Sequence, residues 1–374
     1  ITARGPRTHL WWRGMSDVSP KNSRSHHFER KVPGGKLVVV DAVEDGKAIT
    51  EVSVSGDFFL EPEEAFGAIH DALVGAPLSE DTEALTARLE RALAGMDVQL
   101  HGFTLHDVAQ TTRRAVLGAR DLTDFDWTVI RGTVQPSPVN VALDQLLLEQ
   151  VAAGERGPTL RFWEWEDRAV VFGSYQSYAN ELDQQGVDKH GVTPVRRISG
   201  GGAMFMEGGN CVTYSLYVPE EAVRGLSYEE SYRYLDQWVL AGLKSLGVEA
   251  WYVPINDITS TGGKIGGAAQ KRVRGAVLHH TTMSYDIDAD KMTEVLRIGK
   301  VKISDKGIRS AKKRVDPLRR QTGVPREQVI DTLIEAFMSR YPSTFGELGE
   351  DDLAAARRLV DEKFGTDAWT HRVP

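Results

Sequence analysis

The clearest concentration of potential chemistry in the sequence is a pair of arginines followed closely by three glycines, at Arg196-Arg197-Ile198-Ser199-Gly200-Gly201-Gly202. Guanidinium groups can hold carboxylate or phosphate oxygens in pairs. Glycines let a ligand approach bare backbone N–H groups and adopt backbone angles closed to other residues. A glycine-rich hairpin with two solvated arginines has the same composition. Taken alone, the stretch is therefore only a candidate anion site.

A second glycine cluster places one lysine, Lys264, between two glycine pairs. It is not a P-loop, because Ile265 follows the lysine where that motif requires Ser or Thr at the start of a helix. A Gly-Lys turn in a hairpin is the alternative. Asn256 and Asp257 lie just upstream and shift the balance towards function. They can hold a metal-bound triphosphate or a ribose, while a fixed lysine stabilises charge that develops at a phosphate or carbonyl.

Together these groups favour activation of a carboxylate by a nucleotide over hydrolysis. The sequence contains no Gly-x-Ser-x-Gly elbow that would present a serine nucleophile. His279 and His280 are neighbours on a predicted strand, so they point to opposite faces and make a poor metal pair. We interpret them as structural or substrate-contacting. Cys211 begins an apolar strand, which indicates a small core residue rather than a nucleophile.

The elements that must position these groups belong to a chain of 374 residues, 41% hydrophobic and 26% charged, which predicts two or three folded domains. No apolar run approaches the roughly 18 residues of a membrane span, and the first residues lack the apolar core of a signal peptide. A single cysteine excludes an intrachain disulfide and any cysteine-only metal site. We therefore expect a cytoplasmic protein without a membrane partner.

Charge is unevenly distributed along the chain. The formal net charge of −8 argues against general nucleic-acid binding. Residues 297–320 nevertheless carry ten Lys or Arg against two Asp, a local charge of +8 that leaves −16 for the remainder. A solvated basic face is one interpretation, and a surface that meets pyrophosphate or an acidic protein is the other.

The organisation of the first third of the chain follows from its periodicity. Residues 1–27 are rich in Arg, Ser and His without periodicity and are predicted to form a mobile tail. A small α+β domain is expected at 28–118, with strands at 37–43 and 48–55 and helices at 62–74, 79–94 and 104–117. Polar residues 119–126 are the predicted linker.

The second domain, residues 127–374, is predicted to hold a mixed sheet. Its strands are rich in aromatic and β-branched residues and are expected at 127–131, 159–164, 168–172, 194–198, 203–206, 212–218, 249–252 and 276–287. One helix begins at Ser137-Pro138, where serine caps and proline suits the first turn. Further helices are expected over 227–246, which carries an aromatic stripe, and near 326–340 and 351–364. The fold class is therefore α+β.

The second domain resembles the lipoate-protein ligases of the biotin/lipoate ligase superfamily over most of residues 127–340. The resemblance is carried, in order, by Val170-Val171-Phe172-Gly173-Ser174-Tyr175-Gln176, Arg196 to Phe205 with Gly209-Asn210, Asn256-Asp257, Lys264-Ile265-Gly266-Gly267, His279-His280-Thr281-Thr282 and Ile308-Arg309-Ser310. It implies a class-II-synthetase-like mixed sheet with flanking helices. It also implies a two-step reaction, in which lipoate and ATP with Mg²⁺ give lipoyl-adenylate and pyrophosphate, and an acceptor lysine then takes the lipoyl group.

The resemblance also assigns roles to residues. Lys264 is expected to be catalytic and to touch both the lipoate carboxyl and the α-phosphate, where a cation cancels the repulsion between the reacting groups. Asp257 is the expected Mg²⁺ ligand. The expected contacts of ATP and lipoyl-adenylate are Arg197, Ser199, Gly200, Gly201, Gly202, Ala203, Met204, Phe205, Asn256, Asp257 and Lys264.

Two details qualify that assignment. Arg197 rather than Arg196 is the expected ligand contact, because neighbours on a strand face opposite ways. Met206-Glu207 stands where family members often have His-Asp. Any contact made by that histidine is therefore absent or replaced here.

The first domain resembles the accessory domain of lipoate ligases at Val54-Ser55-Gly56-Asp57-Phe58-Phe59-Leu60-Glu61-Pro62. That domain usually follows the catalytic domain or is a separate chain, so the order here is swapped. Its expected role is to support adenylation. The alternative is an ordinary strand-to-helix turn at Gly56-Asp57-Phe58-Phe59.

Three other functions stay open. An octanoyl- or lipoyltransferase acting from an acyl carrier needs a nucleophilic cysteine near the lysine, and no cysteine follows Lys264. A biotin ligase has a different arginine-glycine loop. A non-catalytic lipoate-binding protein is disfavoured because Lys264, Arg197 and Asp257 occur together.

The predicted function is ATP-dependent lipoate ligation by a monomer. The expected acceptors are apo lipoyl domains of 2-oxoacid dehydrogenase complexes and the glycine-cleavage H protein. The basic stretch 297–320, with Lys312 and Lys313, is expected to cover the adenylate and meet the acidic acceptor. Lipoate and octanoate are not distinguished, because an apolar tunnel recognises both tails.

Overall fold

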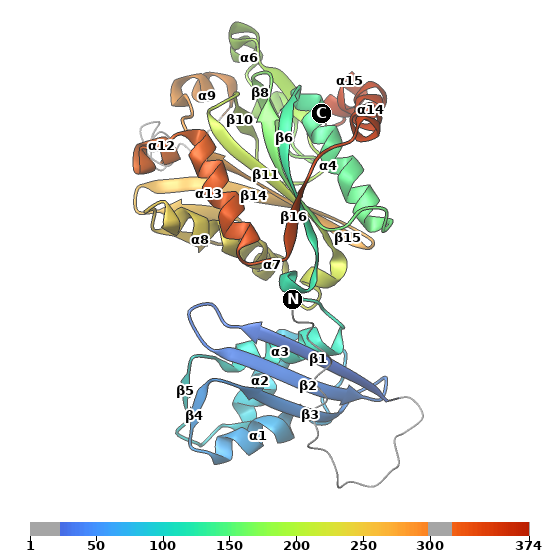
Figure 1. Cartoon of the computed structure of the whole chain (residues 1–374), viewed down its shortest axis with the longest axis vertical. Helices are drawn as coiled ribbons and strands as arrows, with labels where there is room; N and C mark the ends of the chain where they lie inside the picture. The colour runs from blue at the N-terminus through green and yellow to red at the C-terminus, as the bar shows by residue number, and fades with distance from the viewer. Residues whose placement is uncertain (1–22, 298–315, 374) are drawn as a thin grey trace, which may run out of the picture. The chain divides into compact units, whose positions relative to one another are not determined.

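The computed structural model describes residues 23–297 and 316–373 and divides the chain into two compact units, Ile1–Ala119 and Arg120–Pro374 (Figure 1). Residues 1–22 of the predicted tail lie outside the described residues. So do Ile308-Arg309-Ser310, Lys312, Lys313 and most of the basic stretch. No helix in the described ranges is long and apolar enough to cross a membrane.

Unit 1 is an antiparallel three-stranded sheet in the order β1-β2-β3, covered by helices and extended by a short second sheet. Its strands are β1 (Arg24–Lys31), β2 (Leu37–Glu44), β3 (Ile49–Gly56), β4 (Phe59–Glu61) and β5 (Gln99–His101). Its helices are α1 (Glu64–Leu73), α2 (Thr82–Ala92) and α3 (Leu105–Val116). The core lies between helices and sheet and includes Val38, Val40, Leu73, Leu89 and Val108.

The predicted tail is wrong over residues 24–27, which begin β1. Arg24 pairs with Glu44 of β2, and His27 pairs with Asp41. The next residue, Phe28, is 4% exposed and anchors the strand in the core. Because ladder hydrogen bonds join backbone groups, a strand can form from polar residues that carry no periodic signal.

The segment Gly56-Asp57-Phe58-Phe59 joins β3 to β4, so it connects two strands rather than a strand and a helix. A Cβ at Gly56 would lie 2.0 Å from the Leu37 carbonyl oxygen, which explains the glycine. The Asp57 carboxylate accepts a hydrogen bond from the Leu37 N–H, and the Phe58 ring packs 4.2 Å from Phe103.

Unit 2 is built on an eight-stranded mixed sheet in the order β12-β13-β14-β15-β11-β7-β6-β16. Neighbours from β12 to β7 pair antiparallel, whereas β6 pairs parallel with both β7 and β16. The strands are β6 (Trp127–Gln135), β7 (Thr159–Trp165), β11 (Cys211–Pro219), β12 (Ala250–Val253), β13 (Asp257–Ser260), β14 (Gly263–Val273), β15 (Ala276–Ser284) and β16 (Ser343–Gly346).

Helices cover both faces of this sheet, and each face has its own core (Figure 1). Strand β11 shows the alternation: Tyr214 and Leu216 pack in one core with Trp238 and Leu333, whereas Tyr217 packs in the other. The helices are α4 (Ser137–Ala152), α5 (Tyr178–Glu181), α6 (Gln184–His190), α7 (Tyr228–Leu235), α8 (Gln237–Ser245), α9 (Ala289–Val295), α12 (Leu318–Thr322), α13 (Arg326–Met338), α14 (Glu350–Leu359) and α15 (Asp367–Thr370). The predicted mixed sheet with flanking helices is confirmed.

A separate three-stranded sheet carries the first glycine cluster. It has the order β10-β8-β9, with β8 (Ala169–Phe172) at its centre, parallel to β9 (Thr193–Arg196) and antiparallel to β10 (Met204–Met206). The glycines lie in the loop from β9 to β10.

Three predictions for unit 2 need correction. The linker 119–126 belongs almost wholly to unit 2, because Leu122 and Phe125 are buried in its core. The helix expected over 227–246 is two helices that meet at Asp236, whose buried carboxylate is 2.7 Å from His279 Nε2. The second glycine cluster, for which the sequence predicts no strand, lies mostly in the strand β14.

Candidate active site

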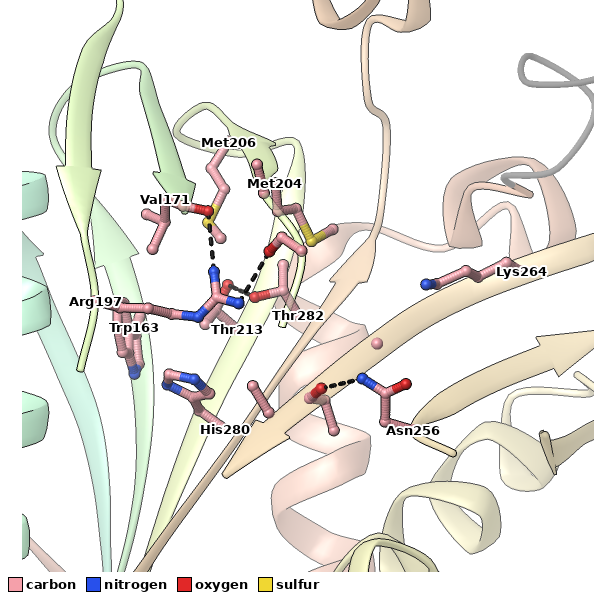
Figure 2. A pocket seen from close by; sticks show the side chains of 15 residues that line it. Trp163, Val171, Arg197, Met204, Met206, Thr213, Asn256, Lys264, His280 and Thr282 are labelled. Carbon is pink, nitrogen blue, oxygen red and sulfur yellow. Dashed lines mark hydrogen bonds between the residues drawn. The ribbon is translucent and has the colours of Figure 1, made fainter. Parts of the chain in front are cut away.

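A pocket of about 140 Å³ lies between the small sheet and the β13-β14-β15 edge of the large sheet (Figure 2). One end is mainly apolar, where Trp163, Val171, Met204 and Met206 line it. Lys264 and Asn256 lie on the other side, across from Arg197 and Trp163 in the view of Figure 2. The pocket therefore offers an apolar end for a hydrophobic tail and a cationic, polar end for its acidic head.

Arg197 organises the glycine loop. Its guanidinium donates to the Ser199 hydroxyl at 2.9 Å and to the carbonyl oxygens of Val171 at 3.1 Å, Gly200 at 2.5 Å and Gly202 at 2.9 Å. Gly201 has a φ of +90°, a region that favours glycine. Burial lowers the pKa of Arg197 to about 10, so it stays charged at neutral pH. These bonds leave one N–H of Nη1 without an acceptor among the described residues, available to a ligand.

Arg196 faces away from the pocket, as predicted, and is fully buried. Its Nη1 donates to the carbonyl oxygens of Gly173, Ser174 and Gln176 at 3.1, 3.2 and 2.6 Å. Its Nη2 donates to the Thr370 carbonyl oxygen at 2.7 Å. Arg196 therefore joins the loop that follows β8 to the C-terminal segment, residues 367–373, and it is not an anion ligand.

Lys264, the lysine predicted to be catalytic, projects from β14. Lys264 Nζ lies 2.7 Å from Asp257 Oδ1 on β13, and both side chains are partly exposed. The neighbouring Asn256 donates to the Ala268 carbonyl oxygen at 2.6 Å and lines the pocket. The structure thus brings together Arg197, Lys264, Asn256 and Asp257, which come from separate parts of the sequence.

The glycines around Lys264 serve close strand packing. A Cβ at Gly266 would lie 2.7 Å from the Thr282 carbonyl oxygen of β15. A Cβ at Gly267 would lie 3.2 Å from Lys264 Nζ and 3.4 Å from Asp257 Oδ1. Gly267 therefore leaves the space in which the lysine and the aspartate meet.

Some predicted ligand contacts are not at the pocket wall. Of the loop residues, Gly202, Ala203 and Met204 line it, whereas Gly200 and Gly201 do not. Phe205 is fully buried and packs with Val170 and Phe172. Because side chains alternate along β10, Phe205 points away from the face that Met204 and Met206 share. A nucleotide contact by the Phe205 side chain is therefore excluded in this arrangement.

A buried polar network lies behind the pocket. Asp144 Oδ2 is 2.7 Å from His280 Nδ1, and His280 Nε2 is 2.7 Å from Ser199 Oγ. Asp144 Oδ1 also accepts from Arg161, Ser215 and Tyr217. With Asp144 as acceptor, His280 donates from Nδ1 and accepts the Ser199 hydroxyl at Nε2.

Charges in this network follow from burial. Burial lowers the pKa of His280 and outweighs the opposing effect of Asp144, so the ring is neutral at neutral pH. Burial alone would raise the pKa of Asp144. The hydrogen bond from His280 and the positive charge of Arg161 reverse this and hold it below its usual value. The buried ion pair is therefore Asp144 with Arg161.

Hydrogen bonds join Ser199 to His280 and His280 to Asp144, as in the catalytic triad of a hydrolase. Ser199, however, does not line the pocket. It is fully buried and already accepts a hydrogen bond from Arg197. A nucleophile must reach the reacting carbon. We conclude that this network holds the loop in place.

The two adjacent histidines point to opposite faces of β15, as predicted. His279 is fully buried and lies 2.7 Å from Asp236, in a different network from His280. In the described residues, no group of three or more His, Cys, Asp or Glu can hold a metal ion. Asp257 is thus a single carboxylate, which suits a cation that arrives bound to phosphates rather than a resident metal.

Cys211 is the only cysteine and is fully buried at the start of β11. Burial raises its pKa to about 11, so it is a thiol at neutral pH. It is not part of the pocket lining. A low-pKa, accessible thiolate is the reactive form of cysteine, and Cys211 has neither property.

Several lining residues were absent from the predicted contacts: Trp163, Val171, Met206, Thr213 and Thr282. His280, interpreted above as structural or substrate-contacting, also lines the pocket. Thr282 belongs to the same motif, His279-His280-Thr281-Thr282, which could have indicated it. Met206 contributes an apolar wall to the pocket. Its neighbour Glu207 is held by Arg168 at 2.7 Å and by Lys291 at 3.1 Å.

The mixed sheet, the arginine-held glycine loop and the strand-borne lysine define a class-II-synthetase-like catalytic domain. A family model described as the lipoyl protein ligase A/B catalytic domain matches residues 136–338, and the chain belongs to that family. The resemblance to lipoate-protein ligases is thereby confirmed. The match lies within unit 2, so unit 1 is outside it.

Known relatives include both transferases and ligases. The octanoyltransferase LipM of Halalkalibacterium halodurans is 27% identical over 277 residues, covering 66% of this chain and 99% of the relative. Lipoate–protein ligase 1 of Staphylococcus aureus is 30% identical over 242 residues, covering 62% of this chain and 69% of the relative. A bi-partite lipoate protein ligase of Thermoplasma acidophilum has a similar solved structure, with a TM-score of 0.60 and 26% identity over 67% of this chain and 98% of that one.

Proposed function

We propose that this protein is an ATP-dependent lipoate-protein ligase, which makes lipoyl-adenylate and transfers the lipoyl group to a lysine of an acceptor domain. The observation that carries the proposal is the pairing of a cationic pocket with an unreactive cysteine. Lys264 and Arg197 line the pocket from opposite sides, whereas Cys211 is buried, does not line the pocket and has a raised pKa. Transfer through a cysteine thioester needs a thiolate beside the acyl carbon, and this chain offers none there.

The residues suit both steps. In the first, a lipoate carboxylate oxygen bonds to the α-phosphorus of ATP while the bond to the pyrophosphate oxygen breaks. Lys264 lies where its ammonium can bridge carboxylate and α-phosphate and so reduce their repulsion. In the second, the acceptor amine attacks the acyl carbon, loses a proton and displaces AMP. Lys264 polarises the carbonyl in that step.

The apolar end suits the acyl tail. The whole pocket has a volume of about 140 Å³, similar to cavities that hold a single six-membered ring, so its apolar end accommodates at most a dithiolane ring or the end of an octanoyl chain. The nucleotide would then extend from Lys264 along Asn256 and Asp257. Mg²⁺ carried by the ATP phosphates would be held by Asp257 and would neutralise phosphate charge.

Unit 1 is proposed to act as the accessory domain that supports adenylation. The sequence around Gly56-Asp57-Phe58-Phe59 supports this assignment, and unit 1 precedes the catalytic unit in the chain. The bi-partite ligase of Thermoplasma acidophilum provides a precedent for a ligase built from two parts.

The runner-up function is octanoyl transfer from an acyl carrier, which the names of relatives such as LipM favour. The deciding assay incubates the protein with lipoate, ATP, Mg²⁺ and an apo lipoyl domain and measures the acceptor's mass. The ligase proposal predicts a lipoyl mass gain that Lys264→Ala loses and that Lys244→Ala, an exposed lysine on α8, retains. Equal gain with Lys264→Ala, or gain only from an octanoyl carrier without ATP, contradicts it.

A further inference from the structure

A second cavity, of about 300 Å³, lies on the other side of the glycine loop from the candidate active site. Ile198 of the loop lines it, as do Ser174 and Tyr175, which follow β8. Lys271 enters from β14, and Trp369 and Arg372 enter from the C-terminal segment. No function assigned above uses this cavity.

Three cations converge on the cavity: Lys271, Lys363 and Arg372. In the described part of the chain, none of them forms an ion pair with a carboxylate. Lys363 donates to the Gln145 side-chain oxygen at 2.7 Å and lies 4.1 Å from the Trp369 ring centroid. Arg372 stacks 4.5 Å from the same ring. Aromatic faces orient these charges without neutralising them.

One carboxylate lines the same cavity, and it does not cancel the cations. Glu149 is bonded through Oε1 to the amide of Gln145 at 2.9 Å, and it is exposed. Three cations against Glu149 leave a local charge of +2 in a protein whose formal net charge is −8. Burial lowers the pKa of Lys363. The charge of Glu149 opposes this shift, whereas Arg372 and Lys271 add to it by repulsion. An anion between them would relieve that repulsion.

We propose that this cavity binds the dianionic phosphate group of a small molecule, on Lys271, Lys363 and Arg372. A carboxylate would neutralise only half of the excess charge, whereas a phosphate or phosphate monoester neutralises all of it. The volume is about twice that of cavities that hold benzene, so a phosphate with a small substituent fits. The proposal does not depend on the ligase activity, because it uses none of the residues placed around the acyl tail or the adenylate.

The position of the cavity is well defined by the fold. Arg196 donates to the Thr370 carbonyl oxygen at 2.7 Å, and Trp369 Nε1 donates to the Arg196 carbonyl oxygen at 2.8 Å. These bonds hold the aromatic and cationic residues of the C-terminal segment against β9. The site is therefore preorganised, which reduces the entropic cost of binding.

The test is calorimetric titration of the full chain at constant ionic strength with inorganic phosphate, ribose 5-phosphate and acetate. We expect phosphate binding to weaken about tenfold or more in Arg372→Gln and in Lys271→Gln, because each removes a charge-assisted contact. Lys264→Ala and Lys244→Gln should bind phosphate as the wild type does. Tighter binding of ribose 5-phosphate than of phosphate identifies a monoester as the ligand class, and equal binding identifies free phosphate.

Other results overturn the proposal. Acetate binding as tightly as phosphate would show that no dianion site exists. Loss of phosphate binding in Lys264→Ala, with retention in Arg372→Gln, would place the anion in the candidate active site instead. Absence of phosphate binding by the wild type would also refute it. Arg372 is exposed and its side chain makes no hydrogen bond in the described structure, so its substitution tests binding without unfolding the protein.

Discussion

Lys264 Nζ and Asp257 Oδ1 lie 2.7 Å apart across neighbouring strands, and Gly267 leaves the room in which they meet. The pair gives the lysine a fixed position at the edge of the pocket before any ligand arrives. Because catalysis by a fixed charge depends on its placement, the geometry of this pair matters more than its contribution to stability.

Gly267→Ala should reduce kcat/KM for lipoyl transfer about tenfold, since misplacing a catalytic group by a fraction of an ångström is costly. The added methyl would lie 3.2 Å from Lys264 Nζ, so the lysine must move. The matched control is Gly157→Ala, where the added methyl lies 3.8 Å from its nearest neighbour. Steady-state kinetics of acceptor lipoylation check this, and equal effects of the two substitutions would contradict it.

Arg197→Met should destabilise unit 2 by about 2 kcal/mol or more, because it removes the donor to a buried carbonyl oxygen at Val171 and to partly buried carbonyl oxygens at Gly200 and Gly202. The control is Arg131→Met, which removes partly exposed ion pairs with Glu327 and Asp331. That change should cost less than about 1 kcal/mol. Urea unfolding followed by tryptophan fluorescence measures both. If Arg197→Met lowers the free energy of unfolding no more than Arg131→Met does, the glycine loop does not depend on the hydrogen bonds of Arg197.

Cys211→Ala should leave lipoyl transfer within about twofold of wild type, because the thiol is buried and its raised pKa keeps it protonated. Its cost should appear in stability, since removal of a buried sulfur leaves a small void. Lipoate-dependent exchange of labelled pyrophosphate into ATP, measured without acceptor, should also persist. A variant that folds but loses acyl transfer would instead favour the octanoyltransferase function.

Residue type and glycine context predicted Lys264 and Arg197 as site residues, and both line the pocket. Each of these two residues stands in a glycine-rich stretch that also fits a plain hairpin, and only their combination with Asn256 and Asp257 indicates a site. Side-chain orientation and pairing over long sequence distances could not be predicted in this way. Phe205 belongs to the same motif as Arg197, but its strand turns it into the core. Arg196 donates a hydrogen bond to the carbonyl oxygen of Thr370, which lies 174 residues further along the chain, and no local sequence pattern predicts such a contact.

Strands were predictable where their own residues are apolar, and not where a neighbouring strand determines them. The strongly apolar strands were recognised, whereas β14 was not, because its glycines indicate a turn unless the neighbouring strand is known to require close approach. The polar start of β1 was not predicted, because its side chains pair with Asp41 and Glu44 of β2 and show no apolar alternation of their own. His280 was recognised as structural or substrate-contacting, but its partner Asp144 lies 136 residues away.

The pairing of His280 with Asp144 predicts how stability depends on pH. Burial lowers the folded-state pKa of His280 from the ordinary value of 6.5. Below pH 6.5 the unfolded chain therefore binds a proton that the folded chain does not, and acidification favours unfolding. This contribution is fully present above pH 6.5 and is lost as pH falls towards the folded-state pKa. Asp144, whose pKa is also lowered, adds a loss in the same direction only below about pH 4.

The measurement is the free energy of unfolding of wild type and His280→Asn at intervals from pH 8 to pH 5. The wild type should lose up to about 1.4 kcal/mol more per pH unit than the variant below pH 6.5, which is the limit for one proton. His280→Asn should also be less stable at pH 8, because Asp144 and Ser199 lose their partner. Parallel curves for wild type and His280→Asn would mean that His280 is as easily protonated in the folded protein as in the unfolded chain, and that the loop is not held by a neutral histidine.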